Sequence, residues 1–271
     1  MANPPNWCAV ARTLIMAVAR AATITAHARG YRLLATINTT SNAATVQGTM
    51  LGVVDTDQHT GAFSLRESVA GQNISILERL SGLTAYMRLP SSPALQHLTG
   101  GKAWIKLDFG QALGALGFSG LPGQGADPTQ FIDYLRAVGA KTTRIGTETI
   151  DGAQTTHYHV VVNLDNDSKL FAPARRAGVA HGVSTLEAAM GTHTMPMHVW
   201  IDNQKLLRRM RFSFGECVQS QHLTMGMTMN LSDYGRQAVA AAPSPSQAYD
   251  LTPLVLKSLK NFKPGTCGPT A

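Results

Sequence analysis

The chain has 271 residues, of which 44% are hydrophobic and 14% charged, and its formal net charge is +7 at pH 7. This composition excludes a chain that is disordered throughout, because there are enough apolar side chains to build a large core. The basic residues are dispersed, with the densest group at 208–211, and aromatic residues make up only 6%. We therefore expect no nucleic-acid binding, whereas a weak attraction to anionic lipid head groups fits the charge.

The first 29 residues predict an N-terminal helix. Apolar side chains recur there at helical spacing, at Val10, Leu14, Val18 and Ala21 or Ala22. The apolar stretch 13–19 and the residues 26–28 make a poor match to an export signal, and no small-residue lipid-anchor motif precedes Cys8. No run of about 18 apolar residues occurs, so no membrane-spanning helix is expected. We interpret residues 1–29 as a helix that packs on the body and as a degenerate export segment at most.

After this helix the hydrophobic period changes to two, which is typical of strands. Short segments rich in Thr, Val, Ile and Leu are separated by turn residues and predict strands at 31–40, 44–54, 61–69, 72–80, 83–89 and 102–107. Strands joined by such short turns pair as an antiparallel meander. The first half of the body is therefore predicted to be one antiparallel sheet.

The middle of the chain is different. Residues 109–126 are apolar but broken by glycines, and we expect a short helix and an apolar loop. Asp127 and Pro128 are a favourable N-cap and first position for a helix that ends at Gly139. Further strands are expected at 142–150, 154–164, 195–202, 206–214 and 219–232, with a helical interruption at 168–190 and a last helix at 251–262.

The last long strand carries the clearest single pattern. Apolar residues alternate with small polar ones, the apolar set being Leu223, Met225, Met227, Met229 and Leu231. This face is either part of an ordinary core or the lining of an adaptable apolar cavity, because flexible thioethers suit ligands of varied shape. Both interpretations place the methionines inward, and they differ on whether protein or lipid fills the space.

Histidines are the one residue type here with the spacing of a metal site. His157 and His159 share one face of a predicted strand, but a third ligand is not determined by the spacing, and His193, His198 and Cys217 are loose candidates. We favour a polar strand face over a metal site. Cys8, Cys217 and Cys267 have no C-x-x-C spacing. A pair between the last two and three free thiols both remain open.

No catalytic motif is recognised. Residues 117–120 lack the second glycine of a serine-hydrolase nucleophile elbow, and the glycine-rich run 110–125 lacks the Lys-Ser or Lys-Thr ending of a phosphate-binding loop. The sequence therefore predicts a protein that is not an enzyme and needs no cofactor or metal.

The chain resembles the LppX/LprG-type actinobacterial lipoproteins, which have the LolA-like fold, in the order and spacing of a series of short sequence motifs. The motifs are Tyr86-Met87-Arg88-Leu89-Pro90, Gly101-Lys102-Ala103-Trp104-Ile105-Lys106-Leu107, Asp127-Pro128, Gly152 to Tyr158, Met195 to Asp202, Leu207-Arg208-Arg209 and Ser232-Asp233-Tyr234-Gly235. The resemblance covers roughly residues 20–250. It implies an α+β fold, in which helices cover the concave face of a strongly curved antiparallel half-barrel sheet.

The same resemblance implies the function and the site. Residues 30–235 would form the lipid-binding domain, and 236–271 a Pro/Ala-rich linker and C-terminal helix. The protein would be a non-enzymatic, monomeric carrier of acylated lipids or glycolipids such as lipoglycans in the extracytoplasmic cell envelope, with transient membrane contact. The expected lipid-binding residues are Leu113, Leu116, Phe118, Leu121, Phe131, Ile132, Leu135, Met225, Met227 and Met229.

Two other functions stay open at this point. LolA-like domains also serve as envelope sensors that bind a protein partner, and such a sensor would have a well-packed core and an exposed apolar patch. A metal-dependent enzyme built on His157 and His159 would need a third ligand nearby.

Overall fold

A computed structural model describes residues 6–41, 45–69, 72–115, 141–163, 193–218 and 221–259. In this part of the chain, twelve strands form one sheet, in the order β12-β6-β5-β4-β3-β2-β1-β11-β10-β9-β8-β7. Every neighbouring pair is antiparallel except β12 and β6, which run parallel. The sheet is open, with β12 and β7 as its edges. The expected antiparallel sheet with a few helices is confirmed, and it does not close into a barrel.

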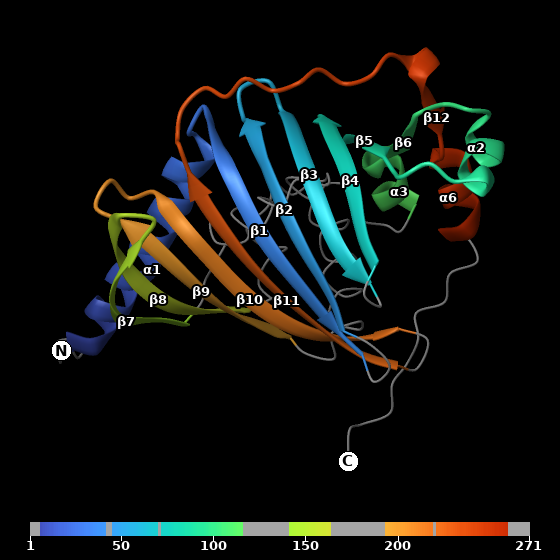
Figure 1. Ribbon diagram of the computed structural model, residues 1–271. Coiled ribbons are helices and arrows are strands. Elements are labelled where there is room, and N and C mark those ends of the chain that lie inside the picture. The colour runs from blue at the N-terminus through green and yellow to red at the C-terminus, as the bar shows by residue number, and fades with distance from the viewer. Residues whose placement is uncertain are drawn as a thin grey trace.

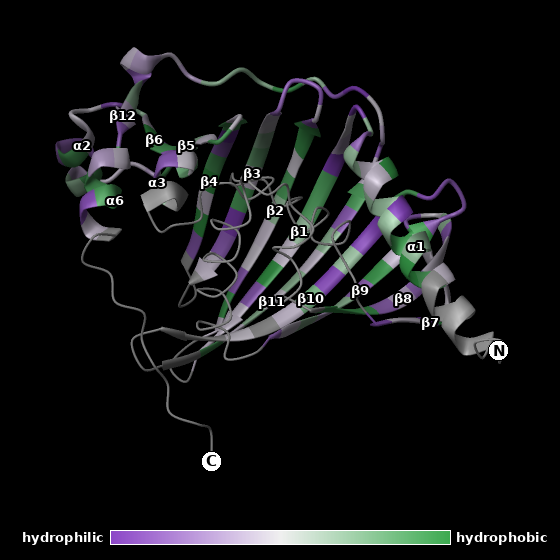
Figure 2. Ribbon diagram, turned by 180° about the vertical axis from the view of Figure 1, so that it is seen from behind, coloured by the Kyte–Doolittle hydropathy of each residue, from purple (hydrophilic) through white to green (hydrophobic). Residues whose placement is uncertain are grey.

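The first six strands are a meander, as predicted. They are β1 (Gly30–Thr40), β2 (Thr45–Asp55), β3 (Thr60–Val69), β4 (Gln72–Ser81), β5 (Thr84–Arg88) and β6 (Trp104–Asp108). Alternating side chains suit a strand with one buried face, and hydrophobic and hydrophilic residues alternate along these strands in Figure 2. β6 begins two residues later than the predicted strand.

The second half is another meander, made of β7 (Lys141–Ile150), β8 (Ala153–Asn163), β9 (Thr194–Asp202), β10 (Leu207–Val218) and β11 (Gln221–Ser232). The predicted hairpin between β7 and β8 is confirmed, with φ of 49° at Asp151 and 79° at Gly152. These positive values are those of the tight turn that suits strand twist. β11 pairs with β1 and thereby joins the two meanders into one sheet.

The described helices are short except for the first. They are α1 (Asn6–Ala26), α2 (Pro93–Thr99), α3 (Phe109–Ala115), the 3₁₀ turn η2 (Pro245–Gln247) and α6 (Thr252–Leu259). α3 matches the short helix expected at 109–126. The predicted helices at 127–139 and 168–190 lie outside the described residues. No described helix has both the length and the apolar character needed to span a membrane.

Three elements were not predicted, namely α2, η2 and β12. Ser92 caps α2 by accepting a hydrogen bond from the backbone N–H of Leu95, and Pro93 occupies its first turn. This is a favourable helix start, so its signal was present in the sequence. β12 (Ala248–Asp250) has three residues, too few for a periodic pattern to be recognised. The segment after β11 crosses over the strand ends to reach it (Figure 1).

The core lies between α1 and one face of the sheet, which we call the inner face. Val18, Ala21 and Ala22 of α1 are at most 2% exposed and belong to the same cluster as Leu33 and Leu231 of the sheet. Figure 2 shows α1 in front of β8 and β9 on this side. The N-terminal helix therefore packs on the inner face of the sheet. The opposite side of the sheet is called the outer face.

Candidate functional site

The methionine row of β11 lies on the inner face, as the alternation predicted. Met229 pairs with Ala35 of β1, and Met227 pairs with Ile37. Cross-strand partners point to the same side of a sheet, and Ala35 is buried with the core. The polar residues between the methionines therefore face outward. Both predicted interpretations of the row required this placement.

The inner face has two parts that differ in burial. Beneath α1, the side chains of Leu33, Met229 and Leu231 have 0% exposure, and they are ordinary core. Further along the strands the inner face is mostly apolar, but its side chains are only half-buried. Six of these apolar residues are Ile37, Met50, Leu65, Ile76, Met225 and Met227. We call these six residues the apolar surface, and it spans β1, β2, β3, β4 and β11.

Glu78 lies on the same face, in β4, and it was missed by the sequence analysis. Its partner in register on β3 is Phe63, which belongs to the core. Glu78 is 8% exposed, and this burial raises its pKa from 4.5 to about 7. The sequence did contain an indication of its burial. In the alternating pattern of β4, Glu78 falls on the same face as the apolar residues Ile76 and Leu80.

The structure describes only some of the ten predicted lipid-binding residues. Met225, Met227 and Met229 lie on the inner face, the first two in the apolar surface and the third in the core. Leu113 falls in α3, but its side chain lies outside the described part of the chain. The remaining six lie outside the described residues altogether: Leu116, Phe118, Leu121, Phe131, Ile132 and Leu135.

The histidines that suggested a metal site gather on the outer face. His157 Nδ1 lies 2.7 Å from Oε1 of Glu148, and its Nε2 lies 2.8 Å from Nδ1 of His198. The ring of His159 is 4.9 Å from that of His198, between centroids. Both nitrogens of His157 are therefore engaged within the protein. In the described part of the chain, no three His, Cys, Asp or Glu side chains are arranged to hold a metal ion.

Trp200 and two arginines complete this outer cluster. The indole ring stacks on His157 at 4.1 Å between centroids, and Arg209 and Arg211 each lie 5.8 Å from the indole. Stacking and cation–π contacts of this kind stabilise a sheet surface. The cluster therefore has a structural explanation that requires no ligand.

The cluster also lowers the pKa of two of its own groups, Glu148 and His198. The Trp200 indole N–H, followed by His157, lowers the pKa of Glu148, although the indole nitrogen completes no hydrogen bond of ordinary geometry. Burial, followed by the positive charge of Arg211, lowers the pKa of His198. His198 is therefore neutral at neutral pH, and Glu148 is ionised.

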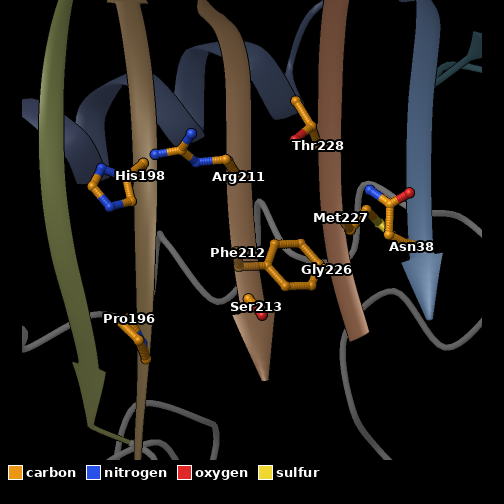
Figure 3. A pocket seen from close by; sticks show the side chains of 9 residues that line it. All are labelled: Asn38, Pro196, His198, Arg211, Phe212, Ser213, Gly226, Met227 and Thr228. Atoms are coloured by element: carbon orange, nitrogen blue, oxygen red, sulfur yellow. The ribbon is translucent and has the colours of Figure 1, made fainter. Parts of the chain in front are cut away.

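A hollow of about 330 Å³ lies beside this cluster (Figure 3). It is centred where Gly226 leaves no side chain between Ser213 and Asn38, which pair with it in register. Its wall is lined by Asn38, Pro196, His198, Arg211, Phe212, Ser213, Gly226, Met227 and Thr228. His198 and Arg211 of the outer cluster stand in this wall, and the hollow is much smaller than the apolar surface that spans five strands of the inner face.

The chain matches no protein-family model and no curated protein. Its fold is similar to that of several solved lipoproteins. Lipoprotein LppX from Mycobacterium tuberculosis has a TM-score of 0.52 at 13% identity, over 85% of this chain and 99% of that chain. LprF from Mycobacterium bovis has a TM-score of 0.44 at 14% identity, over 86% and 97% of the two chains.

A putative outer membrane lipoprotein-sorting protein domain from Vibrio parahaemolyticus is also similar, with a TM-score of 0.29 at 10% identity over 91% and 99% of the two chains. Of these three, only LppX is close enough to carry an argument, and at its identity the likeness shows the fold alone. The protein thus has a large open, mostly antiparallel sheet, and its fold is similar to that of LppX. The resemblance to the LppX type that the sequence suggested is confirmed at this level.

Proposed function

We propose that the protein binds acylated lipids or lipoglycans on its inner face and carries them in the cell envelope. The observation that carries the proposal is the apolar surface, where six half-buried side chains extend the inner face beyond the part that α1 covers. Burial of an acyl chain yields about 0.8 kcal/mol per CH₂ group, so an apolar surface is sufficient for binding. The LppX-like fold supports this proposal.

The proposal is for a carrier and not for an enzyme. His157 bonds to His198 and to Glu148, and the methionines offer contact area without acid–base chemistry. All ten predicted residues, including the seven of Leu113 to Leu135, keep their proposed role in lining the lipid site. We further propose a monomer in an extracytoplasmic location that touches membranes transiently, since its net charge of +7 favours anionic head groups.

The test is native mass spectrometry of the purified protein, followed by organic extraction and identification of the lipids. We expect a stoichiometric acylated species. A charge in the apolar surface should remove it, because an ionised carboxylate in contact with the chain must be desolvated. Met227→Asp and Met225→Asp introduce that charge at two points of the surface.

Adjacent residues of the same strand provide matched controls. Thr228 and Thr224 point to the outer face, so Thr228→Asp and Thr224→Asp add the same charge to β11 without entering the proposed site. Both controls should retain the lipid. Met225 pairs with Thr39 away from the core, so Met225→Asp decides the question if Met227→Asp does not fold. A protein that carries no lipid and takes none from added vesicles would refute the carrier and favour a protein-binding sensor.

A further inference from the structure

Glu78 is an acid in an apolar environment. Its neighbours on the inner face in register are Phe63 of β3 and Met87 of β5, and along β4 they are Ile76 and Leu80. All four are apolar. Among the described residues, no hydrogen bond or ion pair to the Glu78 carboxylate is found, and burial alone accounts for its raised pKa. Burying an unpaired carboxyl group is costly, and a leucine at this position would avoid the cost.

None of the charged side chains described near Glu78 forms an ion pair with its carboxylate. Arg79 is the next residue and lies on the outer face, where its Nη1 donates a 2.8 Å hydrogen bond to the backbone oxygen of Glu78 and its guanidinium lies over Trp104. Glu67, half-buried on the inner face of β3, is another acid and pairs with Ile74 rather than with Glu78. Within the part of the chain that the structure describes, none of these charged groups pairs with the Glu78 carboxyl group, which is therefore open to a polar partner from a ligand.

The place of Glu78 relates it to the apolar surface. Ile76, two residues earlier on the same face of β4, is one of the six residues of that surface, and it pairs with Leu65, which is another. A chain bound along these side chains passes within reach of the Glu78 carboxyl group, because residues i and i+2 of a strand are neighbours on one face.

We propose that Glu78 is the polar anchor of the lipid site and that it hydrogen-bonds a hydroxyl group on the bound acyl chain. This inference rests on the proposed function, and it narrows the ligand to hydroxylated acyl lipids. A neutral carboxyl group donates one hydrogen bond and accepts others, and a hydroxyl group does the same, so the two can satisfy each other in an apolar site. Since its pKa is about 7, Glu78 is neutral in mildly acidic solution.

The test compares two fatty acids that differ by one hydroxyl group, 12-hydroxystearate and stearate, by calorimetric titration of the delipidated protein at about pH 6. We expect the wild type to prefer the hydroxylated chain roughly fivefold, the effect of one net hydrogen bond. Glu78→Leu should lose this preference and still bind stearate. Glu78→Gln should keep part of it, because an amide also donates and accepts. Glu148→Gln changes an acid on the outer face and should behave as the wild type.

The outcomes separate this inference from the proposed function. Equal affinity of the wild type for the two fatty acids would overturn the anchor and leave a lipid carrier. Absence of binding of either fatty acid to the wild type would overturn both. Tighter binding of stearylamine than of 12-hydroxystearate would show that Glu78 pairs with a cation, which contradicts the hydroxyl partner. If Glu78→Leu does not fold, the wild type and Glu78→Gln still decide.

Discussion

The backbone N–H of Leu207 donates a 3.0 Å hydrogen bond to Oγ1 of Thr25, and this bond ties β10 to α1. Both residues have 0% exposure. Leu207 lies at a bulge in the β9–β10 pairing, where the register shifts before Arg209. An interrupted ladder leaves backbone groups that need other partners, and Thr25 supplies one from the helix. The helix that covers the core is thus held by polar contact as well as by packing.

Thr25→Val should lower the free energy of unfolding by about 1–3 kcal/mol, because valine has the same shape but leaves the buried N–H of Leu207 without an acceptor. Urea denaturation measures this change. Thr23 is a matched control, since its hydroxyl bonds only to Ala19 within the exposed side of the same helix. Thr23→Val should stay within about 0.5 kcal/mol of the wild type. Equal effects of the two changes would contradict the role of Thr25.

Asp202→Asn should destabilise the protein by about 3 kcal/mol, because it removes the charge from a buried pair and leaves Arg208 uncompensated. The carboxylate of Asp202 is almost fully buried and lies 2.6 Å from Nε of Arg208. Thermal or urea unfolding measures the loss. The exposed pair of Arg29 with Asp57, at 3.1 Å, is the control. Asp57→Asn should cost less than about 1 kcal/mol, and a larger loss than at Asp202 would be inconsistent with this ranking.

Gly52→Ala should destabilise the protein by about 1–3 kcal/mol, because an added methyl group overpacks the core. A Cβ at Gly52 would lie 2.2 Å from the backbone oxygen of Ala62 and 2.4 Å from Cδ1 of Phe63. The phenyl ring therefore occupies the space that a side chain would need. At Gly146 in β7 an added Cβ meets nothing within 4 Å, so Gly146→Ala should be close to neutral. Denaturant midpoints of the two variants test the difference, and equal midpoints would show that the backbone at Ala62 and the ring of Phe63 both move aside freely.

The stability of the protein should fall as pH rises from about 4.5 to 7 because of Glu78. Its pKa is raised from 4.5 to about 7 by burial, so in this window the unfolded chain releases the proton and the folded protein retains it. The unfolded state binds fewer protons, and stability therefore decreases with pH, by about 3 kcal/mol in total. The difference in unfolding free energy between wild type and Glu78→Gln, followed across this range, isolates the effect.

Glu148 provides a control of opposite sign for this measurement. The Trp200 indole and His157 lower its pKa, so it contributes stability above its ordinary titration range and loses that contribution as pH falls. The difference between wild type and Glu148→Gln should therefore rise with pH. A flat difference for Glu78→Gln would show that the Glu78 carboxyl group is solvated in the folded protein.

Much of the strand arrangement could be predicted because it depends on local spacing. A strand places alternate side chains on opposite faces, so the sequence of β11 was enough to put Met225, Met227 and Met229 on one side. Asp151 and Gly152 form the expected hairpin turn, because both adopt positive φ. The N-terminal helix followed from its apolar repeat in the same way. These features can be predicted without knowing which residues they pack against.

The candidate site was less accessible to sequence reasoning. Glu78 was missed, although its position in β4 places it on the same face as Ile76 and Leu80. A single acid on an apolar strand face can be recognised as buried only when the residues of the neighbouring strands are known. The outer cluster shows how a spacing can suggest a site that the structure does not form. The spacing of His157 and His159 left a metal site open beside the favoured polar strand face. In the structure the partners of His157 are Glu148 and His198, which lie on two other strands.

Sequence by itself determined which residues share a face and where turns fall, because these depend on the geometry of a few successive residues. Only the tertiary structure decided how the two meanders meet. β1 pairs with β11, although Leu33 and its partner Leu231 lie 198 positions apart, and this pairing joins two meanders into one sheet. It also decided that α1 covers one part of the inner face and leaves the apolar surface half-buried. Contacts at such separation depend on the packing of the whole chain, which local periodicity does not encode.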